Sequence, residues 1–136
     1  VDARVDVVAC PPGADAAALT ACVEAGARGL VLEGSGSGNL PPLVARAVTR
    51  LARDRPDVVV VASTRVPRGE ATATYAGAGG GAELATRGVL SCGHLRSGQA
   101  RVLLAALLSA VSDAGPGAGP AADEVRRQWD RYHLYS

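Results

Sequence analysis

The chain has 136 residues, 48% hydrophobic and 20% charged, and its formal net charge is +1. This length suits one folded domain with a sizeable core, and the ordinary apolar content argues against a disordered chain. The near-neutral charge argues against a nucleic-acid or anionic-membrane binder, so we expect neither partner. The chain contains no lysine and a single asparagine, Asn39. No mechanism that needs a lysine can therefore be completed within it.

Four short aliphatic runs of strand length are predicted to form β-strands. They are Val5–Cys10, Gly29–Glu33, Val58–Ser63 and Gly88–Cys92. The third run contains four successive valines. Such a run, without polar alternation, is typical of a strand buried on both faces, as in a parallel sheet covered by helices.

Two helical patterns separate the first three runs. The first starts near Asp15, a suitable N-cap, and ends at Gly26. The second begins at Pro41 and Pro42 and stops before Pro56. On this second helix one face should be buried and the other solvated. The apolar face is Leu43, Ala47, Val48 and Leu51, and the basic face is Arg46, Arg50 and Arg53.

The second half of the chain predicts three more helices. A short one covers about Gly81 to Thr86, and a longer one starts at Ser97, which can cap it. The expected apolar face of the longer helix is Val102, Leu103, Ala106, Leu107 and Ala110. An amphipathic helix over Ala121–Leu134 ends the chain.

This order predicts a three-layer α/β fold, flavodoxin/Rossmann-like, with four parallel strands and helices on both faces. We expect an α/β domain over residues 1–114, a Gly/Pro linker over 115–120, and a helix within 121–136 that packs on the same domain. Ligands of such folds bind outside the carboxyl ends of the strands, at a topological switch point. Four loops should meet there: Cys10–Gly13, Gly34–Asn39, Ser63–Gly69 and Cys92–His94.

The glycine-rich loop Gly34–Asn39 has two interpretations. Its backbone N–H groups could cradle an anion at a helix start. However, the chain lacks the lysine of a phosphate-binding P-loop, and Asn39 stands where a dinucleotide fingerprint needs its third glycine. A tight turn with Asn39 as a helix cap is the simpler interpretation, and it leaves room for a functional Asn39.

Three cysteines are too few for a disulfide framework, and an odd number fits reduced thiols. Cys10, Cys92 and His94 should approach one another at the strand ends. A zinc site would still lack a fourth ligand, and a Cys–His nucleophile would lack an acid to orient the histidine. We therefore expect no metal site, and these residues are left without an assigned role.

Three blocks resemble the smaller, C-terminal domain of bacterial L-asparaginases. They are Gly29–Gly34 followed by Gly36–Leu40, Val58–Ser63 followed by Thr64–Gly69, and Gly88–Ser91 followed by His94-Leu95 and Gln99–Leu104. They come in the order and spacing of the family, over roughly Val5 to Ala110. One block alone would be weak evidence, whereas the ordered set is specific.

The resemblance implies that the chemistry lies elsewhere. In the family, the larger N-terminal domain carries a threonine nucleophile in a TGGT-type turn and a second threonine that works with an aspartate and a lysine. This chain has no Thr-Gly-Gly, no Thr-Asp and no lysine. We therefore expect no catalytic residue here and no activity from the chain alone. The start at Val1 is interpreted as the start of a detached piece.

The resemblance also implies a binding role across a dimer. Asn39, with Ser37 and Gly38 beside it, matches the position that contacts substrate in the neighbouring subunit. Family members also place a glutamate about ten residues past the Arg-Val-Pro turn, where this chain has Tyr75 and no acid. Glu70, Tyr75 and Arg65 are therefore secondary candidates.

The expected parent is an L-asparaginase that converts L-asparagine to aspartate and ammonia without a cofactor. Its implied partners are the missing N-terminal catalytic domain, further copies in a homodimer or homotetramer, and a small amino-acid amide as substrate. A cytoplasmic location is expected, with secretion of the parent left open. Two alternatives remain: a stand-alone α/β small-ligand or interaction module, and the amidase subunit of a tRNA-dependent amidotransferase.

Overall fold

The computed structural model describes residues 3–36, 39–64, 88–113 and 121–132. Its sheet has four parallel strands in the order β1-β2-β3-β4. The strands are β1 (Val5–Ala9), β2 (Gly29–Gly34), β3 (Val59–Thr64) and β4 (Leu90–Ser91). The predicted α/β class with four parallel strands is thus confirmed. The strand order never reverses, however, so the expected switch point is absent from the described sheet.

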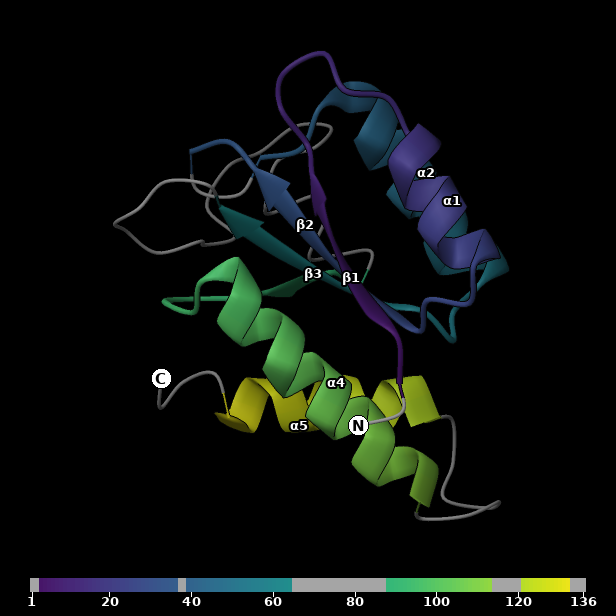
Figure 1. Cartoon of the computed structure of the whole chain (residues 1–136), viewed down its shortest axis with the longest axis vertical. Helices are drawn as coiled ribbons and strands as arrows, with labels where there is room; N and C mark the ends of the chain where they lie inside the picture. Colours follow the sequence, from purple (N-terminus) through teal and green to yellow (C-terminus); the bar gives the residue numbers. More distant parts are fainter. Residues whose placement is uncertain (1–2, 37–38, 65–87, 114–120, 133–136) are drawn as a thin grey trace.

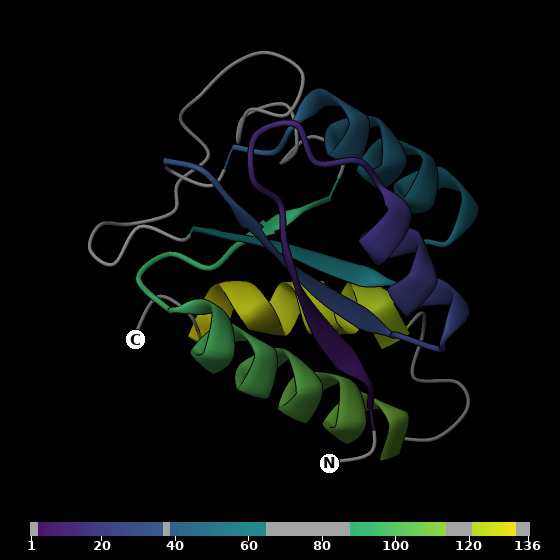
Figure 2. The same ribbon diagram turned by 45° about the horizontal axis from the view of Figure 1, so that its top comes forward.

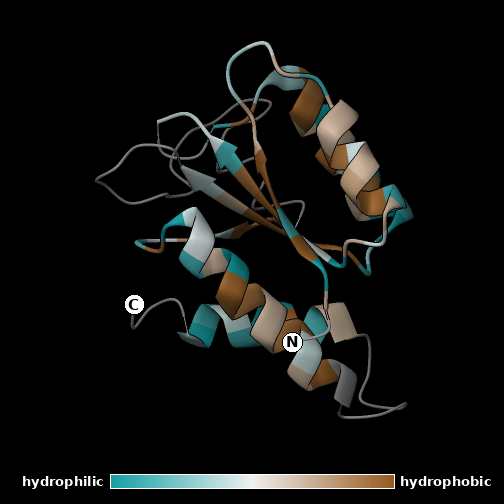
Figure 3. Cartoon of the chain, in the orientation of Figure 1, coloured by the Kyte–Doolittle hydropathy of each residue, from teal (hydrophilic) through white to brown (hydrophobic). Residues whose placement is uncertain are grey.

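Two helical layers enclose the sheet (Figures 1 and 2). The helices are α1 (Ala17–Glu24), α2 (Pro42–Asp54), α4 (Ser97–Asp113) and α5 (Ala121–Tyr132). Helices α1 and α2 cover one face, and α4 and α5 cover the other. Successive strand residues belong to different cores: Val31 packs toward α4, whereas Leu30 and Leu32 pack toward α2. Figure 3 shows the strands apolar along most of their length, with a polar segment at the carboxyl end of β2.

Local sequence signals explain the ends of α1. The N-cap residue is Ala16, so Asp15 is not the cap that the sequence predicted. Asp15 Oδ1 nevertheless accepts a hydrogen bond from Ala17 N at 3.0 Å, which satisfies one free donor of the first turn. At the other end Gly26 has a φ of +101°, which glycine adopts without steric cost. Gly26 N donates to Val23 O and Ala27 N donates to Cys22 O, both at 3.0 Å. This pair of bonds is the Schellman arrangement that ends a helix.

The buried faces of two helices differ from the prediction. On α2, Leu43 is 50% exposed and Val44 is buried in its place. On α4, Val102 is 59% exposed, and Ala106 and Ala110 are exposed as well. Among the described side chains of α4, Leu107 is buried as predicted, and the others that are buried are Ala100, Leu104, Ala105, Leu108 and Val111. Both helices carry adjacent apolar residues, so the sequence pattern leaves the rotation of the helix open.

Helix α4 approaches the sheet very closely over Gly29, the first residue of β2. A Cβ atom at Gly29 would lie 2.7 Å from Leu104 Cδ2 and 3.1 Å from Leu108 Cδ1. Helix α5 completes this layer through Trp129, which is fully buried. The indole Nε1 of Trp129 donates to Ser91 O on β4 at 2.8 Å. In the part of the chain that the structure describes, no helix is long and apolar enough to cross a membrane.

Candidate functional site

The carboxyl ends of the strands form one continuous edge, where polar groups follow buried runs. Cys10 N donates to Glu33 O at 2.8 Å, which joins the end of β1 to the end of β2. Cys92 N donates to Ala62 O at 3.1 Å, which joins the β4 end to β3. The described strand ends therefore lie along one edge of the sheet, but Cys10 follows β1 and Cys92 follows β4, the two outer strands. The expected approach of Cys10 to Cys92 and His94 is thus wrong, because two strands lie between them.

The glycine-rich turn between β2 and α2 is closed by its own backbone. Ser35 N donates to Asn39 O at 2.9 Å, and Asn39 N donates to Ser35 O at 2.8 Å. Inside this closed turn Gly36 has a φ of +54°, a conformation that favours glycine. The Thr64 hydroxyl, at the end of β3, donates to Gly36 O. Asn39 is thus held at the neck of a turn that is anchored to two strands.

Asn39 does not cap α2. The helix begins at Pro42, the flanking residue is Pro41, and no side chain makes a cap hydrogen bond. The interpretation of Asn39 as a helix cap is therefore wrong, because two further residues separate it from the first turn. Its side chain remains available for another role.

The side-chain oxygen of Asn39 is buried without a partner. Oδ1 is shielded from solvent and accepts no hydrogen bond within the described part of the chain. An unsatisfied buried acceptor costs about 1–3 kcal/mol. Native proteins rarely leave such groups unpaired, so each one calls for an explanation. The arrangement suits an N–H donor that the described residues do not supply.

A second polar group lies beside the turn, on the α4 side of the sheet. Ser97 Oγ donates to Glu33 Oε2 at 2.7 Å, and the hydroxyl oxygens of Ser63 and Ser97 are 2.9 Å apart. Ser63 is fully buried. Sequence reasoning treated Ser97 only as a cap and did not consider Glu33 as a site residue. The available signal was an acid that ends an otherwise apolar strand.

The thiols at the strand ends are packed rather than reactive. Burial raises the pKa of the Cys10 thiol to about 11, with a further contribution from the nearby Glu33 charge. Burial also raises the pKa of Cys92. Among the described residues no three histidine, cysteine or acidic side chains gather closely enough to hold a metal ion. His94 is exposed at this edge.

The remaining site candidates are Ser37, Gly38, Arg65, Glu70 and Tyr75. All five lie outside the described residues, as does the short helix expected over 81–86.

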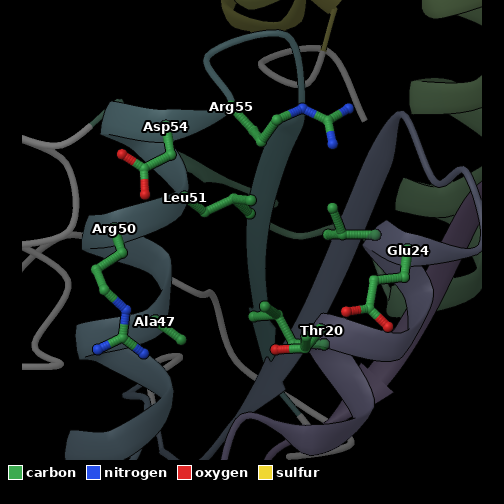
Figure 4. Close-up of a pocket in the computed structure, with 9 residues that line it drawn as sticks. Thr20, Glu24, Ala47, Arg50, Leu51, Asp54 and Arg55 are labelled. Carbon is green, nitrogen blue, oxygen red and sulfur yellow. The ribbon is translucent and has the colours of Figure 1, made fainter.

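A separate hollow of about 270 Å³ lies between α1 and α2 (Figure 4). Apolar side chains line it together with charged ones such as Glu24, Arg50 and Asp54. It lies between the C-terminal halves of the two helices, which lead into the amino ends of β2 and β3. Ligands of open α/β sheets bind at the opposite edge. The strand-end turn with Asn39 is therefore the better candidate site.

Comparison with known proteins identifies the family to which this domain belongs. The model of the glutaminase/asparaginase C-terminal domain matches residues 4–115. The chain belongs to the glutaminase/asparaginase C-terminal domain family. It is 34% identical over 109 residues to an L-asparaginase of Bacillus licheniformis, covering 80% of this chain and 33% of that protein. It is 36% identical over 101 residues to a probable L-asparaginase of Deinococcus radiodurans, covering 74% of this chain and 27% of that protein.

The chain thus spans about a third or less of the curated relatives that it matches. The resemblance to asparaginase C-terminal domains expected from the sequence blocks is confirmed. The match includes β1 to α4, and helix α5 lies beyond it. The part of the glutaminase/asparaginase C-terminal domain that matches therefore contains the whole strand-end edge, including Asn39.

Proposed function

We propose that this glutaminase/asparaginase C-terminal domain serves an L-asparaginase that hydrolyses L-asparagine to aspartate and ammonia. The observation that carries the proposal is the buried, unpaired Oδ1 of Asn39 at the neck of the glycine turn. The named relatives, an L-asparaginase and a probable L-asparaginase, support the choice of reaction. In this proposal the domain contributes a dimer interface and a substrate contact, not the nucleophile.

The chemistry of an asparagine side chain suits this role. Its oxygen accepts from an N–H donor, such as the ammonium group of an amino-acid amide, and its NH₂ group donates to a carboxylate. One residue can therefore contact both charged groups that an amino acid carries. The closed turn between Ser35 and Asn39 fixes the backbone of Asn39 before substrate binds, which lowers the entropic cost of binding.

The nucleophile is proposed to be a threonine of an N-terminal domain that this chain does not contain. An acyl–threonine intermediate would form with release of ammonia, and water would then release aspartate. We expect the pure 136-residue chain to release no ammonia from L-asparagine above background. Activity that copurifies with the chain and survives replacement of Asn39 would indicate a contaminant. Activity that is lost when Asn39 is replaced would belong to the chain itself, and would overturn the proposal that the nucleophile lies in another domain.

The decisive experiment replaces Asn39 with alanine in the full-length protein that contains this domain. Loss of a buried hydrogen bond to substrate costs about 1–3 kcal/mol, which is a fall of roughly 5–150-fold in kcat/KM. Thr49→Ala is the matched control, because its hydroxyl bonds to Ala45 O at 3.1 Å within α2, away from the turn. Unchanged kinetics in the Asn39 variant would remove this residue from the site.

Association of two copies is part of the same proposal. Leu43 on α2 and Val102 on α4 expose 50% and 59% of their surface, but these helices cover opposite faces of the sheet, so the two side chains do not form one patch. Sedimentation of the full-length protein should give a dimer or a tetramer. A monomer at high concentration would refute a substrate contact made across subunits.

A further inference from the structure

The polar group formed by Glu33, Ser63 and Ser97 has no part in the function proposed so far. It joins three elements: Glu33 is in β2, Ser63 is in β3, and Ser97 is the first residue of α4. The hydrogen bond between Ser97 and Glu33 connects residues 64 positions apart in sequence. A partly buried polar connection of this kind favours one arrangement of its elements, because breaking it leaves the fully buried Ser63 hydroxyl without its Ser97 partner.

The direction of the hydrogen bonds follows from proton counting. A carboxylate can only accept, so the single hydroxyl proton of Ser97 lies on the 2.7 Å bond to Glu33 Oε2. Ser97 Oγ must therefore accept in its 2.9 Å contact with Ser63, whose hydroxyl is the donor. The relay runs from Ser63 through Ser97 to Glu33.

Both ends of the relay adjoin the turn that carries Asn39. Glu33 precedes Gly34 and Ser35, and Ser35 closes the turn by exchanging two backbone bonds with Asn39. Ser63 precedes Thr64, whose hydroxyl holds the carbonyl of Gly36. Successive strand residues point to opposite faces, so the relay is fixed on the α4 side while its neighbours hold the turn.

We infer that Glu33, Ser63 and Ser97 are positioning residues that set the place of the Asn39 side chain by locking the start of α4 to the ends of β2 and β3. The relay itself touches no substrate in this arrangement. The inference depends on the proposed function in one respect only: the proposed function supplies the substrate that Asn39 contacts. Its structural content can be tested on this chain alone.

The test uses the fact that the chain has a single asparagine. Selective ¹⁵N labelling of asparagine side chains gives one pair of amide NMR signals, which report directly on Asn39. Ser97→Ala and Glu33→Ala should each shift this pair toward its value in the urea-unfolded chain. Ser97→Thr, which keeps the hydroxyl, should restore it, and the control Thr49→Ala should leave it in place.

Two variants keep the test decisive if one of them fails to fold, since circular dichroism identifies the folded variants first. Unmoved Asn39 signals in a folded Ser97→Ala or Glu33→Ala chain would overturn the inference. In the full-length protein, Ser97→Ala should lower kcat/KM about tenfold, and should lower it no further when Asn39 is already alanine. An additional tenfold loss in the double variant would overturn positioning through Asn39. Absence of asparaginase activity would refute the proposed function while leaving the NMR result standing.

Discussion

Replacing Gly29 with alanine adds one methyl group at the point where α4 crosses the start of β2. That methyl carbon would lie 2.7 Å from Leu104 Cδ2 and 3.1 Å from Leu104 Cγ and Leu108 Cδ1. Each of these contacts is shorter than ordinary van der Waals separation. Leu104 and Leu108 are fully buried, so neither can swing into solvent to make room. The helix or its side chains must therefore shift.

The expected cost combines two opposing terms. Overpacking of a well-packed core by one methyl group costs about 1–3 kcal/mol. Alanine also restricts the unfolded chain more than glycine does, which returns about 0.4–1 kcal/mol. The net loss in free energy of unfolding should be about 1–2 kcal/mol. For a chain of 136 residues this corresponds to a fall in Tm of about 3–8 °C.

Thermal unfolding followed by circular dichroism measures this effect, with Gly98→Ala as the matched control. Nothing lies within 4 Å of a Cβ at Gly98, which is in the first turn of α4. There alanine should raise the Tm, since it is a better helix former by up to about 1 kcal/mol. In a Leu104→Ala background, Gly29→Ala should become nearly neutral. A Tm at or above wild type for Gly29→Ala alone would refute the close approach.

Two further predictions concern buried groups. Trp129→Phe removes the 2.8 Å hydrogen bond to Ser91 O and should lower the free energy of unfolding by about 1–3 kcal/mol. Urea titration measures this change, and an unchanged free energy of unfolding would mean that this bond does not hold α5 to β4. The raised pKa of Cys10, about 11 against 9.0 for the ordinary thiol, means that the folded chain keeps a proton that the unfolded chain releases. The contribution of Cys10 to stability should therefore be constant well below pH 9 and fall by on the order of 2 kcal/mol between pH 9 and 11. The urea midpoint should fall less over this range in Cys10→Ala, and an equal fall in both proteins would contradict the assignment.

The strands could be read from the sequence because each is a short aliphatic run. The run Val58–Ser63, expected to be buried on both faces, differs by one residue at each end from β3 (Val59–Thr64). The rotation of the helices could not be predicted in the same way. Leu43 and Val44 are adjacent and both apolar, and only contact with the sheet decides that Val44 is buried. On α4 the choice depends on where α5 packs, which no local pattern encodes. Val102 was therefore placed wrongly, whereas Leu107 was placed correctly.

The candidate site, like the helices, could be predicted only in part from the sequence. Asn39 could be singled out from the glycine loop, and its unpaired oxygen agrees with a binding role without testing it. Glu33 could not be singled out, because its partner Ser97 lies 64 residues later in the chain. An acid that ends an apolar strand is a visible signal, but it does not identify the residue that the acid contacts. Its role becomes visible only when α4 brings a hydroxyl to it.

The two cores of the sheet draw on different stretches of the chain, and this has a consequence for folding during synthesis. The α1/α2 core uses residues up to Val60, apart from Val89. The opposite core joins Val5, Val31 and Val59 to residues as late as Trp129, and Ala3 N donates to Ser109 Oγ across 106 positions. A nascent chain can therefore assemble its first helical layer while the other face of the same strands still lacks α4 and α5. Until those helices leave the ribosome, that apolar face is open to aggregation and to chaperones, and the rate of folding is limited by contacts distant in sequence.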